Sequence, residues 1–210
     1  MRILFHKAIA MDWENHYLDK HTPWDKGAAA PPLLEWVDSN PGAISGKVMI
    51  PGSGKGHDGR ALVEKTDASH VIGLDISPSA VASANIENGS AQFQSEVGDL
   101  FDLPPAHQSA FDWVWEHTCF CAIEPEMRDA YVEAVHLALK PDGELLAVFY
   151  RDPYDDEHSP GEGPPHGTTV EELRERFEGS GRFQILESYV PRASYDGREG
   201  LEQMMRLKPL

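Results

Sequence analysis

The most informative part of the sequence for the fold is Val48-Met49-Ile50-Pro51-Gly52-Ser53-Gly54-Lys55-Gly56-His57-Asp58. The apolar run Lys47–Ile50 predicts a short buried strand, the alternating glycines predict a tight turn, and a helix is expected next. Strand, glycine turn and helix in this order are typical of a nucleotide site, because glycine lets a ligand approach the backbone closely. The alternative is that these glycines are ordinary residues of a strand-to-helix connection.

Acidic residues follow the next strands. The run Val71–Asp75 ends in Asp75, about 20 residues after the turn, which is the spacing of a ribose-binding carboxylate. Asp99 and Glu116 stand at two later strand ends. The spacing Gly-x-Gly-x-Gly differs from the Gly-x-Gly-x-x-Gly of dinucleotide sites, so we expect a cofactor with a ribose and an adenine but no phosphates. S-adenosylmethionine fits this description. The other interpretation of Asp75 is a cap of the helix that follows.

Strands and helices alternate along the chain. Strands are expected at Lys47–Ile50, Val71–Asp75, Phe111–Glu116, Leu145–Tyr150, Phe183–Val190 and Met204–Leu207. Helices are expected at Pro78–Glu87 after the N-cap Ser77, at Pro125–Leu139 before a turn at Pro141-Asp142-Gly143, and at Val170–Glu178. This alternation predicts an open α/β fold whose parallel sheet is covered on both faces.

The chain of 210 residues predicts one domain, residues 1–210. Residues 1–45, which carry Trp13, Trp24 and Trp36, are expected to form an N-terminal helical cover, and residues 46–210 the α/β core. Residues 151–168 are rich in proline, glycine and acids. They predict a long loop at the carboxyl edge of the sheet, where α/β folds bind ligands.

The charge excludes several classes of function. There are 18 lysines and arginines against 35 acids, a net charge of −17, which argues against nucleic acid as the main partner. A hydrophobic share of 40% allows a sizeable core, and no apolar run is long enough to span a membrane. The two cysteines, Cys119 and Cys121, cannot form a disulfide framework, so a cytoplasmic location is expected.

The sequence motifs, taken together and in their order along the chain, resemble those of the thiopurine S-methyltransferase superfamily, most closely its halide/thiol methyltransferase branch. The resemblance spans about residues 12–208 and rests on Thr22-Pro23-Trp24-Asp25, Ile50–Asp58, Gly73–Ser77, Cys121–Arg128, Leu139–Leu145 and Gly163-Pro164-Pro165. It implies a Rossmann-like, seven-stranded class I methyltransferase fold with an N-terminal helical lid. It also implies S-adenosylmethionine as methyl donor and S-adenosylhomocysteine as product.

The resemblance assigns site residues by motif match. Trp13, Tyr17 and Trp24 would line the pocket that holds the sulfonium and the acceptor. Gly52 and Gly54 would contact the methionine end of the cofactor, Asp75 its ribose, and Asp99 and Leu100 its adenine, and Ile76 would also bind the cofactor. Glu116 and His117 would lie beside cofactor and substrate, and Arg198 would lie near the substrate. The residues expected to serve catalysis are His117, Arg198, Trp13 and Trp24. The chain departs from its relatives at Tyr17, His117 and His166, all in the substrate pocket.

Methyl transfer is an in-line displacement, for which the protein must hold donor and acceptor close together in a dry pocket. The expected acceptor is a small soft nucleophile, a thiol or sulfide, with a halide or a thiopurine as alternatives. His117 is expected to act as a base or an orienting donor; otherwise it caps a strand end. Arg198 would attract an anionic acceptor or lower the pKa of a thiol; otherwise it is solvated.

Three further expectations complete the sequence-based description. The pair Cys119-x-Cys121 is expected to pack rather than bind a metal, and the histidines show no metal-ligand spacing. The chain is expected to be a monomer without nucleic-acid or membrane partners. Two rival functions remain at this point: a nicotinamide-dependent oxidoreductase, which the glycine spacing disfavours, and a sensor that binds S-adenosylmethionine without catalysis.

Overall fold

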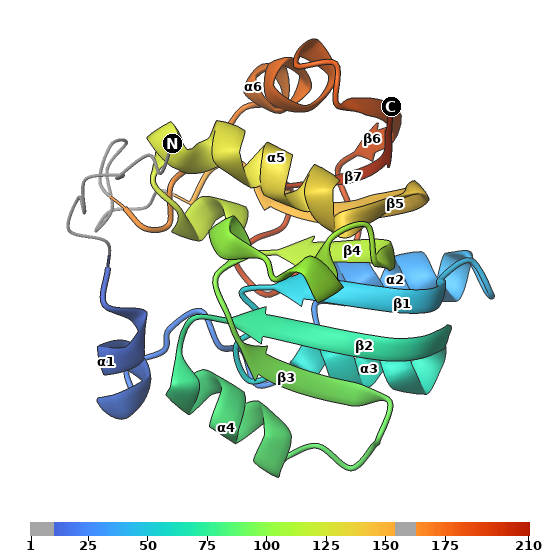
Figure 1. The fold of residues 1–210 in the computed structure, drawn as a ribbon. Helices are drawn as coiled ribbons and strands as arrows, with labels where there is room; N and C mark the ends of the chain where they lie inside the picture. The colour runs from blue at the N-terminus through green and yellow to red at the C-terminus, as the bar shows by residue number, and fades with distance from the viewer. Residues whose placement is uncertain (1–10, 154–162) are drawn as a thin grey trace.

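The computed structural model describes residues 11–153 and 163–210. Its core is a seven-stranded sheet with the strand order β3-β2-β1-β4-β5-β7-β6 (Figure 1). The strands are β1 Ser45–Pro51, β2 Asp67–Asp75, β3 Phe93–Val97, β4 Phe111–His117, β5 Leu139–Tyr150, β6 Phe183–Tyr189 and β7 Glu202–Pro209. The expected seven-stranded α/β fold is thereby confirmed.

The expectation of an all-parallel sheet is wrong at one strand. β7 runs antiparallel to both of its neighbours, β5 and β6, while β1 to β5 pair in parallel. Consecutive strands can pair antiparallel through a loop, whereas a parallel neighbour needs a crossover connection. The segment between β6 and β7 contains no helix, so β7 turns back and inserts between β5 and β6.

Helices cover both faces of the sheet (Figure 1). They are α1 Trp13–Leu18, α2 Pro31–Ser39, α3 His57–Lys65, α4 Pro78–Ile86, α5 Arg128–Ala138 and α6 Val170–Arg174, which continues as a π-helix to Gly179. One apolar cluster joins α2 and α3 to the sheet through Leu33, Trp36 and Leu62. A second cluster joins α5 and the π-helix to the other face through Tyr131 and Phe177. Two cores, one on each face, hold the sheet between them.

Two predicted boundaries are wrong. The predicted helix Pro125–Leu139 begins as a 3-10 turn over Pro125–Met127 and becomes α-helical only from Arg128. The predicted turn Pro141-Asp142-Gly143 lies within β5, which starts at Leu139 and is irregular opposite Phe111. A Cβ on Gly143 would lie 2.9 Å from the carbonyl oxygen of Phe111, so glycine lets this segment run directly beside β4.

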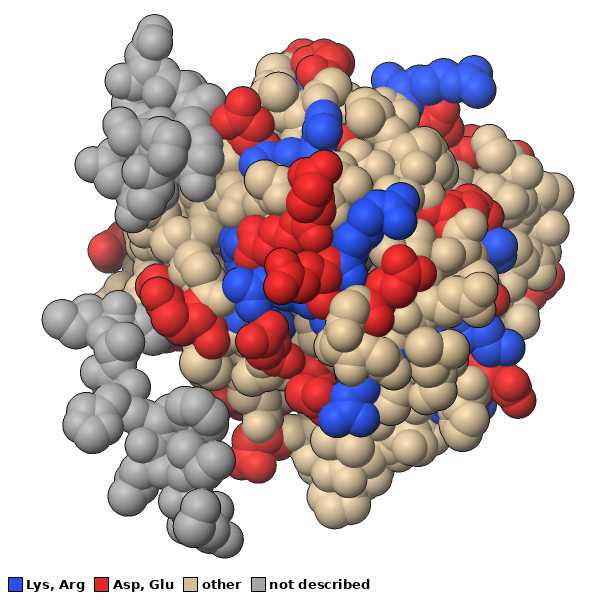
Figure 2. Space-filling view, turned by 90° about the horizontal axis from the view of Figure 1, so that it is seen from above, with Lys and Arg blue, Asp and Glu red and all other residues tan. Residues whose placement is uncertain are grey.

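The α5 and α6 end of the molecule carries mixed charges. Figure 2 shows acidic and basic side chains interleaved over the face seen from above. Arg176 contacts Asp129 at 2.6 Å and Glu172 at 2.7 Å, and Arg128 contacts Glu172 at 3.0 Å. None of the helices in residues 11–153 and 163–210 is both long enough and apolar enough to cross a lipid bilayer.

Candidate active site

The glycine turn lies between β1 and α3, at the carboxyl edge of the sheet. Gly52 and Gly54 have φ angles of 58° and 53°, a region that strains other residues. A Cβ on Gly52 would lie 3.2 Å from Cys119 Sγ, and one on Gly54 would lie 3.0 Å from the hydroxyl oxygen of Tyr17. The turn is therefore a backbone cradle that only glycine can form, with Tyr17 directly above it.

Asp75 fixes the shape of this cradle. Its Oδ2 accepts a hydrogen bond from the Gly54 amide at 2.8 Å, and its Oδ1 accepts one from the Ser77 amide at 2.9 Å. Burial raises the pKa of the Asp75 carboxyl above its ordinary value. The cap of α4 is Ser77, whose hydroxyl accepts from the Ala80 amide. Asp75 thus orders the cradle, and the interpretation of Asp75 as the helix cap is wrong.

An apolar edge continues from the cradle along the ends of β2 and β3. Ile76 is 52% exposed and Phe101 39%, while Leu100 between them in sequence is buried. Asp99 is exposed and accepts from the Phe101 amide at 2.8 Å. An exposed apolar edge with one carboxylate suits a flat heterocycle that carries an amine. The structure brings Asp75, Ile76, Asp99 and Leu100 to the same edge of the sheet.

Three aromatic rings form a cluster over the glycine turn. The rings of Trp13 and Trp24 meet edge to face at 5.2 Å, and Trp24 Nε1–H donates to the Tyr17 hydroxyl at 3.3 Å. Burial raises the pKa of Tyr17 to about 12. A sulfonium is a cation that aromatic rings attract, by about 0.5–2 kcal/mol per contact. The structure brings Trp13, Tyr17 and Trp24 together, as expected from the sequence.

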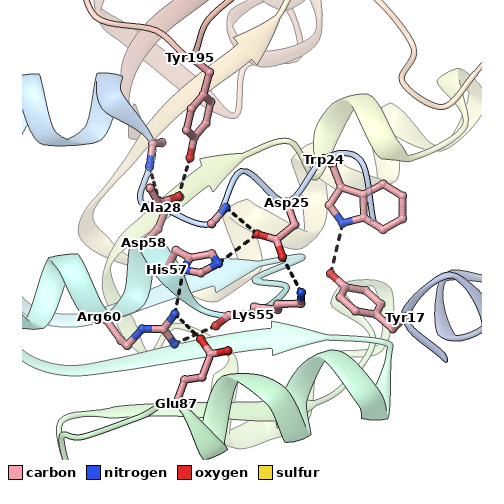
Figure 3. A network of polar contacts seen from close by, with 12 residues as sticks. Tyr17, Trp24, Asp25, Ala28, Lys55, His57, Asp58, Arg60, Glu87 and Tyr195 are labelled. Carbon is pink, nitrogen blue, oxygen red and sulfur yellow. Dashed lines mark hydrogen bonds and ion pairs between the residues drawn. The ribbon is translucent and has the colours of Figure 1, made fainter. Parts of the chain in front are cut away.

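Polar contacts tie the N-terminal segment to the glycine turn (Figure 3). Asp25 contacts Lys55 at 2.7 Å and His57 at 3.0 Å. The Tyr195 hydroxyl donates to the Ala28 carbonyl at 2.6 Å. Segments far apart in the sequence thus converge on one side of the cradle.

Asp58, the second residue of α3, holds His117 at the end of β4. His117 Nδ1 lies 3.1 Å from Asp58 Oδ2, and the same oxygen accepts from Trp115 Nε1 at 2.7 Å. Burial favours the neutral form of Asp58, but these hydrogen bonds outweigh burial and lower its pKa. The Nε2 atom of His117 is buried and has no hydrogen-bond partner among residues 11–153 and 163–210. Asp58 was given no role from the sequence, although its place beside the glycine turn was a usable signal.

Tyr195 lies between Arg198 and this histidine. The guanidinium of Arg198 stands 4.5 Å from the ring centre of Tyr150 and 5.7 Å from that of Tyr195, and the Tyr195 ring stacks on His117 at 5.9 Å. Arg198 is only 9% exposed and pairs with Glu202 at 3.4 Å. The interpretation of Arg198 as a solvated residue is therefore wrong. Sequence reasoning did not identify Tyr150 and Tyr195, which no motif marks.

The side chains of Glu116 and His117 point to opposite faces of the sheet. Alternate residues of a strand point to opposite faces, and Glu116 points into the core under α5. It is 0% exposed, its Oε1 accepts from the Phe120 amide at 2.8 Å, and its Oε2 accepts from the Tyr131 hydroxyl. Burial raises the pKa of Glu116 to about 7. The sequence predicted that Glu116 lies beside cofactor and substrate, whereas in the structure its side chain is buried against Tyr131.

Cys119 packs against Gly52 of the cradle, and Cys121 contacts His166 through the backbone. His166 is buried, with Nε2 3.6 Å from Glu124, and its amide donates to the Cys121 carbonyl. Cys119 and Cys121 are free thiols whose pKa values burial raises. Within the described ranges no group of three or more histidine, cysteine or acidic side chains is arranged to hold a metal ion.

Comparisons with known proteins identify the family of the chain. Residues 9–196 match the family model described as thiopurine S-methyltransferase (TPMT). The chain is 36% identical to thiocyanate methyltransferase 1 of Arabidopsis thaliana, with 98% of this chain and 88% of the relative covered. It is 30% identical to "Probable thiol methyltransferase 2" of the same plant, with 99% and 90% covered.

A solved structure shares the fold. The 1,6-didemethyltoxoflavin-N1-methyltransferase of Burkholderia thailandensis, solved with S-adenosylhomocysteine, matches with a TM-score of 0.70. The match covers 96% of this chain and 87% of that one at 19% sequence identity. At this identity the match shows a common fold and nothing finer.

Proposed function

The chain belongs to the thiopurine S-methyltransferase family, and from this premise we propose that its acceptor is a small thiol or sulfide, methylated on sulfur. It is an S-adenosylmethionine-dependent methyltransferase, and S-adenosylhomocysteine is its second product. Family membership overturns the oxidoreductase alternative. The observation that carries the proposal is the buried imidazole of His117, held at Nδ1 by Asp58 and without a partner at Nε2.

The donor site is assigned to the glycine cradle and its surroundings. The donor supplies a methyl group on a positively charged sulfur. Gly52 and Gly54 let the backbone approach its methionine end, and the Asp75-ordered edge, with Ile76, Asp99 and Leu100, would hold its ribose and adenine. The aromatic rings of Trp13, Tyr17 and Trp24 stabilise positive charge and exclude water.

The acceptor side is assigned to His117, Tyr195 and Arg198. A neutral imidazole nitrogen accepts a proton from an arriving thiol, so that the thiolate is the attacking species. The guanidinium of Arg198 is buried beside Tyr195 and contributes positive potential to the same pocket. Relatives named for thiol and for thiocyanate methylation support a soft sulfur acceptor.

An anionic acceptor, thiocyanate or a halide, is the second candidate. Buried Arg198 favours it, because a fixed cation attracts an anion that needs no deprotonation. A protein that binds the donor without catalysis is the third. Calorimetry with S-adenosylmethionine, followed by product detection with an alkyl thiol, sulfide, thiocyanate, iodide and a thiopurine, separates them. We expect donor binding and methylated sulfur products. Donor binding without any methylated product would identify a sensor.

We also propose that the enzyme is cytoplasmic and monomeric. The two free cysteines support a reducing compartment. Light scattering after size-exclusion chromatography tests the oligomeric state, for which we expect the mass of one chain.

A further inference from the structure

We propose that Asp58 is the positioning residue of a carboxylate–imidazole pair that lets His117 deprotonate a neutral thiol. This inference rests on the proposed function, and it narrows the acceptor class to thiols that arrive protonated. An acceptor that arrives as an anion gains nothing from such a pair.

Asp58 determines which ring nitrogen of neutral His117 carries the hydrogen. Asp58 is a carboxylate, so it can only accept, and the hydrogen on Nδ1 of His117 must point to Oδ2 at 3.1 Å. The neutral ring then has its lone pair on Nε2. That atom is the one that is buried and without a partner in the described structure. A thiol proton is the kind of group that would satisfy it.

Neighbouring groups hold both Asp58 and His117 in place. Asp58 is held by three donors: its Oδ1 accepts from the Ala30 amide at 2.7 Å, while its Oδ2 accepts from Trp115 and His117. The His117 ring is stacked on Tyr195. Thr118 follows with a φ of 65°, so the chain turns sharply directly after the histidine. Neither ring nor carboxylate can rotate away without breaking these contacts.

His57 differs from His117 in the hydrogen bonds of its ring nitrogens. His57 also touches a carboxylate, Asp25, but its Nδ1 accepts from Arg60 at 2.9 Å, so both ring nitrogens are used. The charged and titratable groups around His117 are Asp58 from α3, Tyr195 and Arg198 from the segment between β6 and β7, and Glu116 on the opposite face of β4. Among the described residues, only Asp58 contacts the ring nitrogens of His117.

The reaction balances with groups already named. The thiol proton moves to Nε2 of His117, whose positive charge the Asp58 carboxylate stabilises. The sulfur lone pair forms a bond to the methyl carbon, and the bond from that carbon to the donor sulfur breaks with its electron pair remaining on the donor. The imidazolium then releases its proton to water. The products are a methyl thioether, S-adenosylhomocysteine and one proton.

The test is the pH profile of kcat/KM for 2-mercaptoethanol between pH 6 and 9.5. We expect His117→Phe to lower kcat/KM about 100-fold at pH 7, because general bases contribute that order of magnitude. The deficit should shrink to about threefold at pH 9.5, where an alkyl thiol ionises by itself. Asp58→Asn should show the same pattern. The matched control is His136→Phe, on α5 where the ring packs against Phe183, and it should not show this pattern. A deficit that is equal at every pH would mean a structural role and would overturn the proposal.

A second readout does not depend on turnover. The ¹⁵N resonances of the His117 ring, assigned by their loss in His117→Phe, should show hydrogen on Nδ1 in the wild type. In Asp58→Ala, which removes the acceptor, the preference of the hydrogen for Nδ1 should be lost. Hydrogen on Nε2 in the wild type would overturn the proposal. If no acceptor is methylated, the proposed function fails, while these resonances still decide whether the pair exists.

Discussion

At the scale of single residues, two buried carboxylates near the end of β4 differ in charge. Asp58 is kept ionised by hydrogen bonds that outweigh its burial. Burial dominates at Glu116, whose pKa is raised to about 7. The first carboxylate accepts from the ring of His117, and the second lies in the core and accepts from the Tyr131 hydroxyl. Position on alternate faces of the sheet separates these roles.

Glu116 makes the stability of the protein depend on pH. Folding raises its pKa from 4.5 to about 7, so the folded state binds more protons than the unfolded state between these values. The free energy of unfolding therefore falls as the pH rises through this window, by about 3 kcal/mol at most. Glu116→Gln should lack this loss and should exceed the wild type in stability above pH 7. Urea unfolding at pH 5, 6, 7 and 8 measures it; parallel pH profiles of the two proteins would contradict the assignment.

At the scale of elements, anchoring contacts decide where α1 and the loop before α6 lie. Glu14 of α1 accepts from the Ser79 amide at 3.0 Å and its hydroxyl at 2.6 Å, at the N-terminus of α4. Arg128 of α5 donates to the carbonyls of His166 and Gly167 and to Glu172, and lies 4.6 Å above the ring of Phe120. Each anchor is a single charged side chain that satisfies backbone groups of a distant segment.

Removing Glu14 should loosen α1 over the donor site. Glu14→Ala leaves the first turn of α4 without its anion, which helix N-termini favour. We expect hydrogen exchange in α1 to quicken and the Kd for S-adenosylmethionine to rise, each by about tenfold, since charge-assisted hydrogen bonds are the strong ones. Asp19→Asn, at an exposed position after the same helix, is the matched control. Unchanged donor affinity in Glu14→Ala would separate α1 from the donor site.

Removing Arg128 should destabilise the fold. Its side chain is 2% exposed, and Arg128→Met removes its hydrogen bonds to Glu172 and to the carbonyls of His166 and Gly167. Glu172 is partly exposed and keeps its contact with Arg176, so we expect a cost of about 2–3 kcal/mol from the lost charged hydrogen bonds. The control is Arg174→Met: this arginine is half-exposed and pairs with Glu178 at 3.9 Å, a contact worth about 0.5 kcal/mol or less. Equal midpoints of urea unfolding for the two variants would refute the anchoring role.

Local patterns predicted elements well and pairings poorly. Ser77-Pro78 predicted the start of α4, because both the hydroxyl cap and the fixed φ of proline act within one turn. The glycine turn and Asp75 were likewise predicted. The pair of Asp58 and His117 joins residues 59 positions apart, and no local pattern encodes it. The reversal of β7 depends on how its segment packs against β5, which periodicity does not report.

At the scale of the whole molecule, the net charge of −17 acts on stability and on substrate encounter. Self-repulsion among acids weakens the compact state, and salt screens it beyond about 8 Å at physiological ionic strength. The interleaved charges over α5 and α6 offset part of this repulsion (Figure 2). The excess of acids also opposes the approach of an anionic acceptor, against which Arg198 supplies a local cation.

Salt should therefore stabilise this protein. Raising potassium chloride from 0.05 M to 0.5 M should increase the free energy of unfolding in urea by about 1 kcal/mol, because repulsion among acids is screened. The kcat/KM for thiocyanate should rise with salt, while that for a neutral thiol should stay level. A fall of stability with salt would mean that surface ion pairs outweigh the net charge.

The central claim is that the donor's methyl group goes to a sulfur that arrives protonated. The most direct measurement is a competition at pH 7, with equal concentrations of 2-mercaptoethanol and iodide and a methyl-labelled S-adenosylmethionine. We predict that labelled methyl thioether dominates, one for each S-adenosylhomocysteine formed, and that His117→Phe removes this preference. Labelled methyl iodide as the main product of the wild-type enzyme would contradict the claim.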